Sequence, residues 1–501
     1  MENKTLLLIL DGWGVGEDAD CNAIYRAKPA YWQELWAKYP HSVLHAREES
    51  VGLPGGCLSG SEVAHLTIGA GRIVWQNMAK IANSLTDGTW YENQVLAAAE
   101  KQLVEKGGNI HICGLLSDGG IHSHSDQMVG FINWAKKIQA NNVYLHLFLD
   151  GRDMPPQSAL ELLKTKIVPE LAENIKIATI CGRATAMDRS ENWERTVTTY
   201  NLISGGAGED RNVLDVVSEF YKDGITDEFV PPTRLVTGEM GDNDVVVFAN
   251  FRADRMRQLV RLFTSRAPGA EQDKIKVPNN LFLCSLSEYD PEYHEVYVMY
   301  PPEYPVNTLG EWVSKQGVPQ FRLAESEKYA HVTYFFNGGR EQVFDLENRL
   351  VVPSLGLTNY ASNPEMSADE VTKTLVRVME EDKYGLVVCN LANGDMVGHS
   401  GDIEAGIKAV LAVDKSLQTI IPAAEAAGYT VVITADHGNV ECMNENGVPH
   451  TAHTFNHVPL LITDTKLFLP SSGGYLHQLA PTILKLMRLP KPDEMTSESL
   501  I

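Results

Sequence analysis

Three aspartates follow apolar segments of this chain at the point where each segment ends. Asp11 comes directly after TLLLIL (5–10), Asp395 follows LVVCNLANG (386–394), and Asp436 follows TVVITA (430–435). In open α/β sheets, ligands bind outside the carboxyl ends of the strands. If these segments are strands, the three carboxylates are candidate ligands at one edge of a sheet.

Histidines accompany two of these aspartates. His399 lies four residues after Asp395, His437 adjoins Asp436, and PHTAHT adds His450 and His453. Carboxylate oxygen combined with imidazole nitrogen suits Zn²⁺, Mn²⁺ or Co²⁺ better than Ca²⁺. A lone Asp-His pair is more often a cap or a surface pair, but the recurrence favours metal binding. The number of candidates exceeds the need of one ion, and paired metals often serve phosphoryl transfer.

Ser61 is the candidate nucleophile. It follows a glycine-rich turn in LPGGCLSGSEVAHLTIGAGR (53–72) and precedes an expected helix. One interpretation is a plain helix N-cap. The other is a nucleophile whose alkoxide a metal stabilises, with the N–H groups of the helix start holding a phosphate.

Arginines recur after the expected strands of the middle segment, in FLDGRD, CGRATAMDR and NFRADR. They are Arg152, Arg183, Arg189, Arg252 and Arg255. In a chain this acidic, the recurrence predicts a local pocket for a carboxylate or phosphate, which arginine binds through paired hydrogen bonds. Asp153 is a candidate general base, or alternatively the partner that neutralises Arg152; His122 is a candidate contact to phosphate or hydroxyl.

The elements that must position these residues indicate an α/β fold. Apolar runs of strand length alternate with amphipathic stretches such as 405–427, which is typical of parallel sheets covered by helices on both faces. The runs are 5–10, 110–116, 143–149, 175–180, 244–249, 386–391 and 430–435. The chain could pass from one domain to the other near residues 72–83 and at the proline-rich YPPEYP (300–305). We expect residues 1–75 and 303–501 to form one domain, with 76–302 inserted.

Composition narrows the class of protein. The 501 residues suggest two or more domains, and 65 acidic against 42 basic residues give a net charge of −23, which disfavours nucleic acid and anionic lipid as partners. Seven scattered cysteines fit a reducing compartment better than a disulfide framework. Neither a signal peptide nor a membrane span is evident, so we expect a cytoplasmic protein.

Ten motifs, in order, carry a resemblance to a known family. They are LDGWG, GSEVAHLTIGAGR, LLSDGGIHSH, FLDGRDMPPQSA, AMDRSENWER, NFRADRMRQ, EKYAHVTYFFNGG, NGDMVGHSGD, TADHGNVE and PHTAHT. Together they closely resemble the cofactor-independent phosphoglycerate mutases, which belong to the alkaline-phosphatase-like metalloenzymes. The resemblance covers nearly the whole chain. It implies a phosphatase-like domain made from both chain ends, with a parallel-rich sheet between helices, and an inserted α/β transferase domain that binds the substrate.

The resemblance also implies roles for the candidate residues. One metal would be held by Asp11, Ser61, Asp436 and His437, and the other by Asp395, His399 and His453, with His450 as the alternative to His453. Ser61 would carry the phosphate and Lys328 would contact it. The substrate pocket would contain His122, Arg152, Asp153, Arg183, Arg189, Arg252 and Arg255.

The implied enzyme is an isomerase of glycolysis and gluconeogenesis that interconverts 3-phosphoglycerate and 2-phosphoglycerate. It would use two divalent ions, Mn²⁺ first and Co²⁺, Zn²⁺ or Mg²⁺ as alternatives, without bisphosphoglycerate. The small-molecule substrate would be its partner, and the family suggests a monomer. Asp153 would shuttle the proton between the two hydroxyls.

Several positions depart from the family pattern. Gly60 replaces an asparagine before the nucleophile, Ala184 and Thr185 replace two tyrosines, and Gly394 replaces a proline. None removes a proposed ligand, so these changes bear on rate and selectivity. The alternatives are a metal-dependent phosphatase or sulfatase-like hydrolase, a phosphopentomutase, and a non-catalytic metal-binding protein. The five arginines and the aspartate of the inserted segment disfavour a simple hydrolase, and the DGRD and NFRADR motifs disfavour a phosphopentomutase. The intact ligand set disfavours the third alternative.

Overall fold

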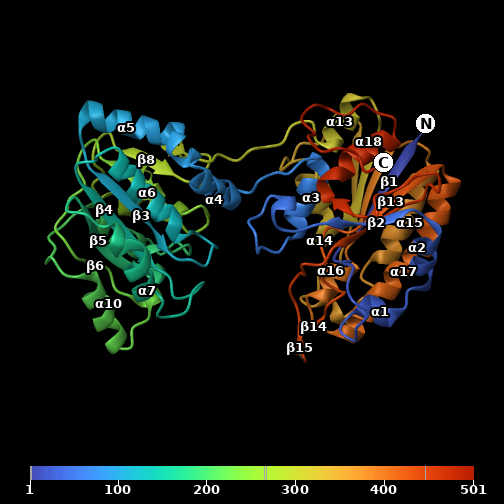
Figure 1. Cartoon of the computed structure of the whole chain (residues 1–501), viewed down its shortest axis with the longest axis horizontal. Coiled ribbons are helices and arrows are strands. Elements are labelled where there is room, and N and C mark those ends of the chain that lie inside the picture. Colours follow the sequence, from blue (N-terminus) through green and yellow to red (C-terminus); the bar gives the residue numbers. More distant parts are fainter. Residues whose placement is uncertain (1–2, 265, 267, 446) are drawn as a thin grey trace. The chain divides into compact units, whose positions relative to one another are not determined.

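The computed structural model describes residues 3–264, 266, 268–445 and 447–501. The chain divides into two compact units, which Figure 1 shows coloured along the sequence. The first unit combines Met1–Gln76 with Tyr304–Ile501, and the second is Asn77–Glu303. Both chain ends therefore belong to one unit. No helix in the described part of the chain is long and apolar enough to cross a membrane.

The first unit is built on an eight-stranded sheet of order β11-β10-β12-β1-β13-β16-β2-β17. Its strands are β11 (Glu347–Val352), β10 (Gln320–Glu325), β12 (Leu386–Leu391), β1 (Lys4–Leu10), β13 (Tyr429–Thr434), β16 (Val458–Ile462), β2 (His41–His45) and β17 (Gly474–Tyr475). Neighbours from β11 to β13 pair in parallel, and β16 runs antiparallel to β13 and β2. The strands predicted at 5–10, 386–391 and 430–435 are confirmed as β1, β12 and β13.

Helices cover this sheet on both faces, as expected for buried parallel strands. Figure 1 shows α2 (Ala30–Lys38), α15 (Ala368–Glu380) and α17 (Ile403–Ala426) on one side, and α3 (Ser61–Ala70) with α18 (Leu479–Leu486) on the other. The predicted helix at 405–427 is α17, which begins two residues earlier. Asp402 accounts for the earlier start, because its carboxylate caps the backbone N–H groups of Glu404 and Ala405.

The order of the sheet decides where the polar residues gather. Strands β10, β12, β1 and β13 are neighbours and parallel, so their carboxyl ends lie along one edge. The chain leaves these ends through α14 (Ser326–Ala330), through α16 (Asn393–Gly398), and through the loops that start at Asp11 and Asp436. The order of the strands in the sheet therefore brings four distant segments together.

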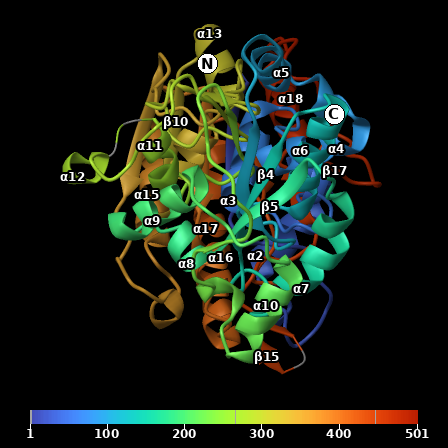
Figure 2. The same ribbon diagram turned by 90° about the vertical axis from the view of Figure 1, so that its left-hand side faces the viewer.

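The second unit has a seven-stranded sheet of order β6-β5-β4-β3-β7-β8-β9. Its strands are β6 (Thr233–Arg234), β5 (Ile175–Gly182), β4 (Val143–Leu149), β3 (Ile110–Leu116), β7 (Val245–Phe248), β8 (Phe282–Ser285) and β9 (Val296–Val298). All neighbours are parallel except β5 and β6. The four strands predicted here from the sequence are confirmed as β3, β4, β5 and β7. The pairing of β4 with β5 is visible in Figure 2.

Candidate active site

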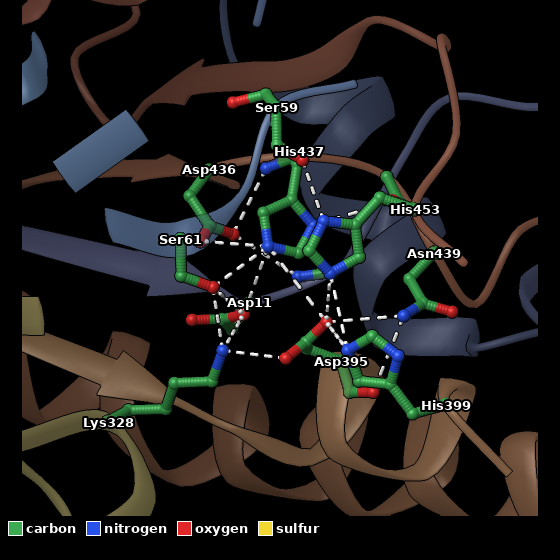
Figure 3. Close-up of polar contacts among 12 residues, drawn as sticks. Asp11, Ser59, Ser61, Lys328, Asp395, His399, Asp436, His437, Asn439 and His453 are labelled. Atoms are coloured by element: carbon green, nitrogen blue, oxygen red, sulfur yellow. Dashed lines mark hydrogen bonds and ion pairs between the residues drawn. The ribbon is translucent and has the colours of Figure 1, made fainter. Parts of the chain in front are cut away.

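Six residues singled out in the sequence meet at the carboxyl edge of the first unit's sheet (Figure 3): Asp11, Asp395, Asp436, His399, His437 and His453. Asp395 lies on α16, in the first turn after β12, and is almost fully buried. Its Oδ1 lies 3.1 Å from Nε2 of His399 and 3.1 Å from Nε2 of His453. The two imidazole nitrogens are 3.2 Å apart. One carboxylate oxygen and two imidazole nitrogens thus converge on one point.

A second group surrounds Asp11 and Asp436, which follow the neighbouring strands β1 and β13. Oδ1 of Asp436 accepts hydrogen bonds from the backbone N–H groups of Gly12 and His437, at 3.3 and 3.0 Å. Its Oδ2 is buried and has no hydrogen-bond partner among the described residues, although Nε2 of His437 lies 3.3 Å away. A buried carboxylate oxygen without a donor is costly unless a cation or a proton reaches it.

Ser61 lies between these groups. It is the first residue of α3, and Gly60 is the N-cap, so the interpretation of Ser61 as an N-cap is wrong. Its Oγ lies 2.9 Å from Nε2 of His437, 2.7 Å from Nζ of Lys328 and 3.3 Å from Oδ1 of Asp11. The hydroxyl therefore faces the acidic cluster instead of capping its own helix.

Lys328 is the cation of this cluster, and it is buried on α14. Its ammonium lies 2.7 Å from Oδ1 of Asp11 and 2.6 Å from Oδ2 of Asp395. Burial opposes the charged form, but the surrounding carboxylates outweigh burial and raise the pKa of Lys328 above its ordinary value. The lysine is consequently fully charged at neutral pH.

The donor set fits divalent metal ions. The buried carboxylates of Asp11, Asp395 and Asp436 outnumber the single ammonium of Lys328, which leaves an excess of negative charge in the interior. Ligand atoms of Asp395, His437 and His453 lie within 4.8 Å of one another, as do those of Asp11, His65 and Asp436. Bound cations would neutralise the excess and satisfy the free oxygen of Asp436.

The alternative ligand from PHTAHT lies elsewhere. Nδ1 of His450 is 3.0 Å from the backbone carbonyl of Cys442, and His450 is in neither group of converging ligand atoms. His453, in contrast, stacks on His437 with ring centroids 3.7 Å apart, and its Nδ1 lies 2.7 Å from the carbonyl of Ser59. Its position favours His453 over His450 as the ligand.

Three polar residues that support the cluster were not recognised in the sequence. The side-chain amide of Asn390 donates to Oδ2 of Asp11 at 2.7 Å and lies 3.1 Å from Nε2 of His65. His65, one turn after Ser61, lies with its Nδ1 2.8 Å from that serine's carbonyl. The amide of Asn439 lies 3.2 Å from Oδ1 of Asp395. The available signals were an asparagine inside an apolar strand and a histidine four residues after the serine.

The second unit carries a separate group of charged residues at the carboxyl ends of β4 and β5. Arg183 is buried, and its Nη1 donates to Asp150 at 2.6 Å and to Asp153 at 2.5 Å. Burial opposes its charge, but these two hydrogen bonds outweigh burial and raise the pKa of Arg183. The alternative in which Asp153 neutralises Arg152 is wrong, because Arg152 pairs with Glu228 at 3.4 Å.

Three of the remaining candidates of this unit, His122, Arg189 and Arg252, lie against Asp254, a residue that was not predicted from the sequence. Arg189 and Arg252 contact its carboxylate at 2.8 and 3.2 Å, and each keeps about half of its side chain exposed. His122 is buried between Asp254 and Asp153, at 3.4 and 3.8 Å. Burial, and then the charge of Arg183, lower the pKa of His122 to about 4, so its imidazole is neutral at physiological pH. Arg255 makes no hydrogen bond to the Asp254 carboxylate in the described part of the chain. Its Nη1 donates to the carbonyl of Met187.

Comparison with known proteins identifies the family. A model of the metalloenzyme superfamily matches residues 3–491. A 2,3-bisphosphoglycerate-independent phosphoglycerate mutase of Bacteroides fragilis is 42% identical, over 100% of this chain and 100% of that protein, and one of Clostridium botulinum is 44% identical, over 100% and 99%. Among solved structures, the phosphoglycerate mutase of Leishmania mexicana at low cobalt concentration matches with a TM-score of 0.63 and 26% identity, over 100% of this chain and 98% of that one. Full-length similarity at this level, together with a buried serine in a cluster of aspartates and histidines, makes this chain a member of the 2,3-bisphosphoglycerate-independent phosphoglycerate mutases within the metalloenzyme superfamily.

Proposed function

We propose that this enzyme interconverts 3-phosphoglycerate and 2-phosphoglycerate through a phosphoserine at Ser61, as a step of glycolysis and gluconeogenesis. The observation that carries the proposal is the position of the Ser61 hydroxyl, buried within 3.3 Å of Lys328, His437 and Asp11. A hydroxyl in this setting lies beside groups that could bind a phosphate, and it is shielded from bulk water. Membership in the family indicates that the substrate is phosphoglycerate.

Two divalent ions, which we take to be Mn²⁺ with Co²⁺, Zn²⁺ or Mg²⁺ as alternatives, would occupy the carboxylate and imidazole cluster. Asp11, Ser61, Asp436 and His437 would hold one ion. Asp395, His399 and His453 would hold the other. When bound, such ions act as Lewis acids that favour the serine alkoxide and withdraw charge from the phosphoryl oxygens.

In the first half of the reaction, Oγ of Ser61, which has already lost its proton, attacks phosphorus. The bond from phosphorus to the substrate oxygen breaks, and that oxygen takes up a proton. Lys328 holds the serine oxygen at 2.7 Å, and its fixed positive charge stabilises the negative charge that develops on the phosphoryl group. In the second half, the other hydroxyl of glycerate attacks the phosphoserine and releases Ser61.

The second unit would bind the glycerate and move its protons. Arg189 and Arg252, whose side chains are half exposed, together with Arg152 and Arg255, would bind the substrate's carboxylate and phosphate. Asp153 would donate a proton to the substrate oxygen released in the first half and accept one from the hydroxyl that attacks in the second half. Arg183 holds this carboxylate in place, and His122 beside it would contact the substrate as a neutral imidazole.

The domain roles follow from this assignment. Residues 1–75 and 303–501 would form the metal-binding, phosphatase-like domain, and 76–302 the substrate-binding transferase domain. We further propose that the enzyme works as a monomer in the cytoplasm, with phosphoglycerate as its partner and without bound bisphosphoglycerate.

The test is a mutase assay without 2,3-bisphosphoglycerate. Chelator-stripped protein should convert 3-phosphoglycerate to 2-phosphoglycerate only after a metal is restored, with Mn²⁺, Co²⁺, Zn²⁺ and Mg²⁺ compared in parallel. Ser61→Ala should abolish conversion and leave the circular dichroism spectrum unchanged, whereas replacement of the partly exposed Ser204 in the second unit by alanine should leave activity at the wild-type level. Inorganic phosphate as the main product would instead support a hydrolase, and substantial mutase activity in Ser61→Ala would exclude the serine as carrier.

A further inference from the structure

Glu441, five residues after Asp436, is a buried carboxylate with four hydrogen-bond donors. Its Oε2 accepts from the backbone N–H groups of Gly14 at 3.1 Å and Asn439 at 2.7 Å. Its Oε1 accepts from the side-chain amide of Asn456 at 3.0 Å and from the hydroxyl of Thr454. Only 2% of the residue is exposed. Each oxygen therefore has two donors, which is the full capacity of an ionised carboxylate.

The donors come from three segments that also carry proposed metal ligands. Gly14 lies three residues after Asp11, and Asn439 lies two residues after His437. Thr454 directly follows His453. A single carboxylate thus connects the ends of three loops that approach the cluster from different parts of the chain.

The surrounding glycines leave room for this carboxylate. A Cβ atom at Gly14 would lie 2.3 Å from Cδ of Glu441, and one at Gly438 would lie 2.2 Å from its Oε1. A Cβ atom at Gly16 would lie 2.8 Å from its Cγ. Any other residue at Gly14 or Gly438 would collide with the carboxyl group. The space that Glu441 requires therefore explains Gly14 and Gly16 of LDGWGVG and Gly438 of TADHGN.

We propose that Glu441 is a positioning residue, which sets the affinity of the cluster for divalent ions by joining the segments of Asp11, His437 and His453. The inference rests on the metal site of the proposed function. Its physical basis is preorganisation: ligands already held in place lose less conformational freedom when an ion binds. A neutral amide has one oxygen and one NH₂ group, so it cannot accept from all four donors without rearrangement.

Calorimetric titration of chelator-stripped protein with Mn²⁺ tests the inference without reference to mutase activity. Glu441→Gln should weaken Mn²⁺ binding by about 10- to 100-fold, the range typical of residues that orient metal ligands. Glu445→Gln is the matched control, because it removes the same charge from an exposed position in the same segment, and it should bind Mn²⁺ as wild type does. Thr454→Val should weaken binding by a smaller factor, and should add nothing in the Glu441→Gln background.

Two results would overturn the inference. One is wild-type Mn²⁺ affinity in Glu441→Gln, or in Thr454→Val if Glu441→Gln does not fold. The other is equal weakening in Leu375→Ala, which loses a buried side chain in α15 and would show that general destabilisation explains the effect. Failure of the mutase assay alone, with these Mn²⁺ affinities as expected, would refute the proposed substrate and leave the role of Glu441 standing.

Discussion

Replacing Lys328 by methionine should destabilise the protein most when metals are absent. The ammonium lies 2.7 Å from Asp11 and 2.6 Å from Asp395, and all three side chains are buried. Breaking a buried ion pair by removing one partner costs about 3–5 kcal/mol, because the other charge stays in the interior. We therefore expect Lys328→Met to lower the free energy of unfolding of the metal-free first unit by about that amount.

Added metal should reduce this loss. The ammonium of Lys328 and the expected divalent ions are attracted by the same carboxylates, so bound ions would neutralise Asp11 and Asp395 in the variant. Urea unfolding followed by tryptophan fluorescence, in chelator and in saturating Mn²⁺, measures both differences. Lys315→Met is the matched control: the half-exposed Lys315 pairs with Glu311 in the same helix at 2.7 Å, and this pair should be worth less than about 1 kcal/mol under either condition.

Two results would contradict the prediction for Lys328→Met. If metal-free Lys328→Met were as stable as wild type, the ammonium of Lys328 would not stabilise the buried carboxylates of Asp11 and Asp395. An equal loss with and without Mn²⁺ would show that the ions do not share its carboxylates. Either result would remove the electrostatic argument for a metal-binding cluster.

Three further predictions concern single residues. Asp153→Asn should lower turnover by about 100-fold or more with Mn²⁺ content unchanged, and loss of metal in this variant would contradict its role in proton transfer. Asn390→Ala should lower the free energy of unfolding in urea by about 1–3 kcal/mol, because Oδ2 of Asp11 loses its donor; an unchanged value would show that this hydrogen bond contributes nothing. The pKa of His122, about 4 in the folded protein, lies below its ordinary value of 6.5, so the unfolded chain binds more protons between these values. Its contribution to stability is therefore present above pH 6.5 and lost as pH falls to about 4, and urea titrations of His122→Asn should show a shallower decline over this window; identical declines would contradict the shift.

The strands that were predicted from the sequence are built on runs in which most residues are apolar, and β10 lacks such a run. β1, β12 and β13 each contain three or more apolar residues in succession, so their local pattern suffices. β10 was missed because QFRLAE contains Arg322 and Glu325, both fully buried. Arg322 is accommodated by Gln320 and by the ring of Phe336, with its guanidinium 4.6 Å from the ring centroid. Phe336 lies outside the strand, so no local pattern reveals that Arg322 belongs in the core.

The sequence by itself determined the α/β class, the family, and the residue types of the site, because strand-forming runs and the polar residues that end them are local features. Tertiary structure decided the pairings. It placed His453 instead of His450 beside Asp395, paired Asp153 with Arg183 instead of Arg152, and made Glu441 the connection between three loops. Each of these contacts depends on which strands are neighbours in a sheet. Strand order is set by packing of the whole domain, and residue spacing along the chain does not encode it.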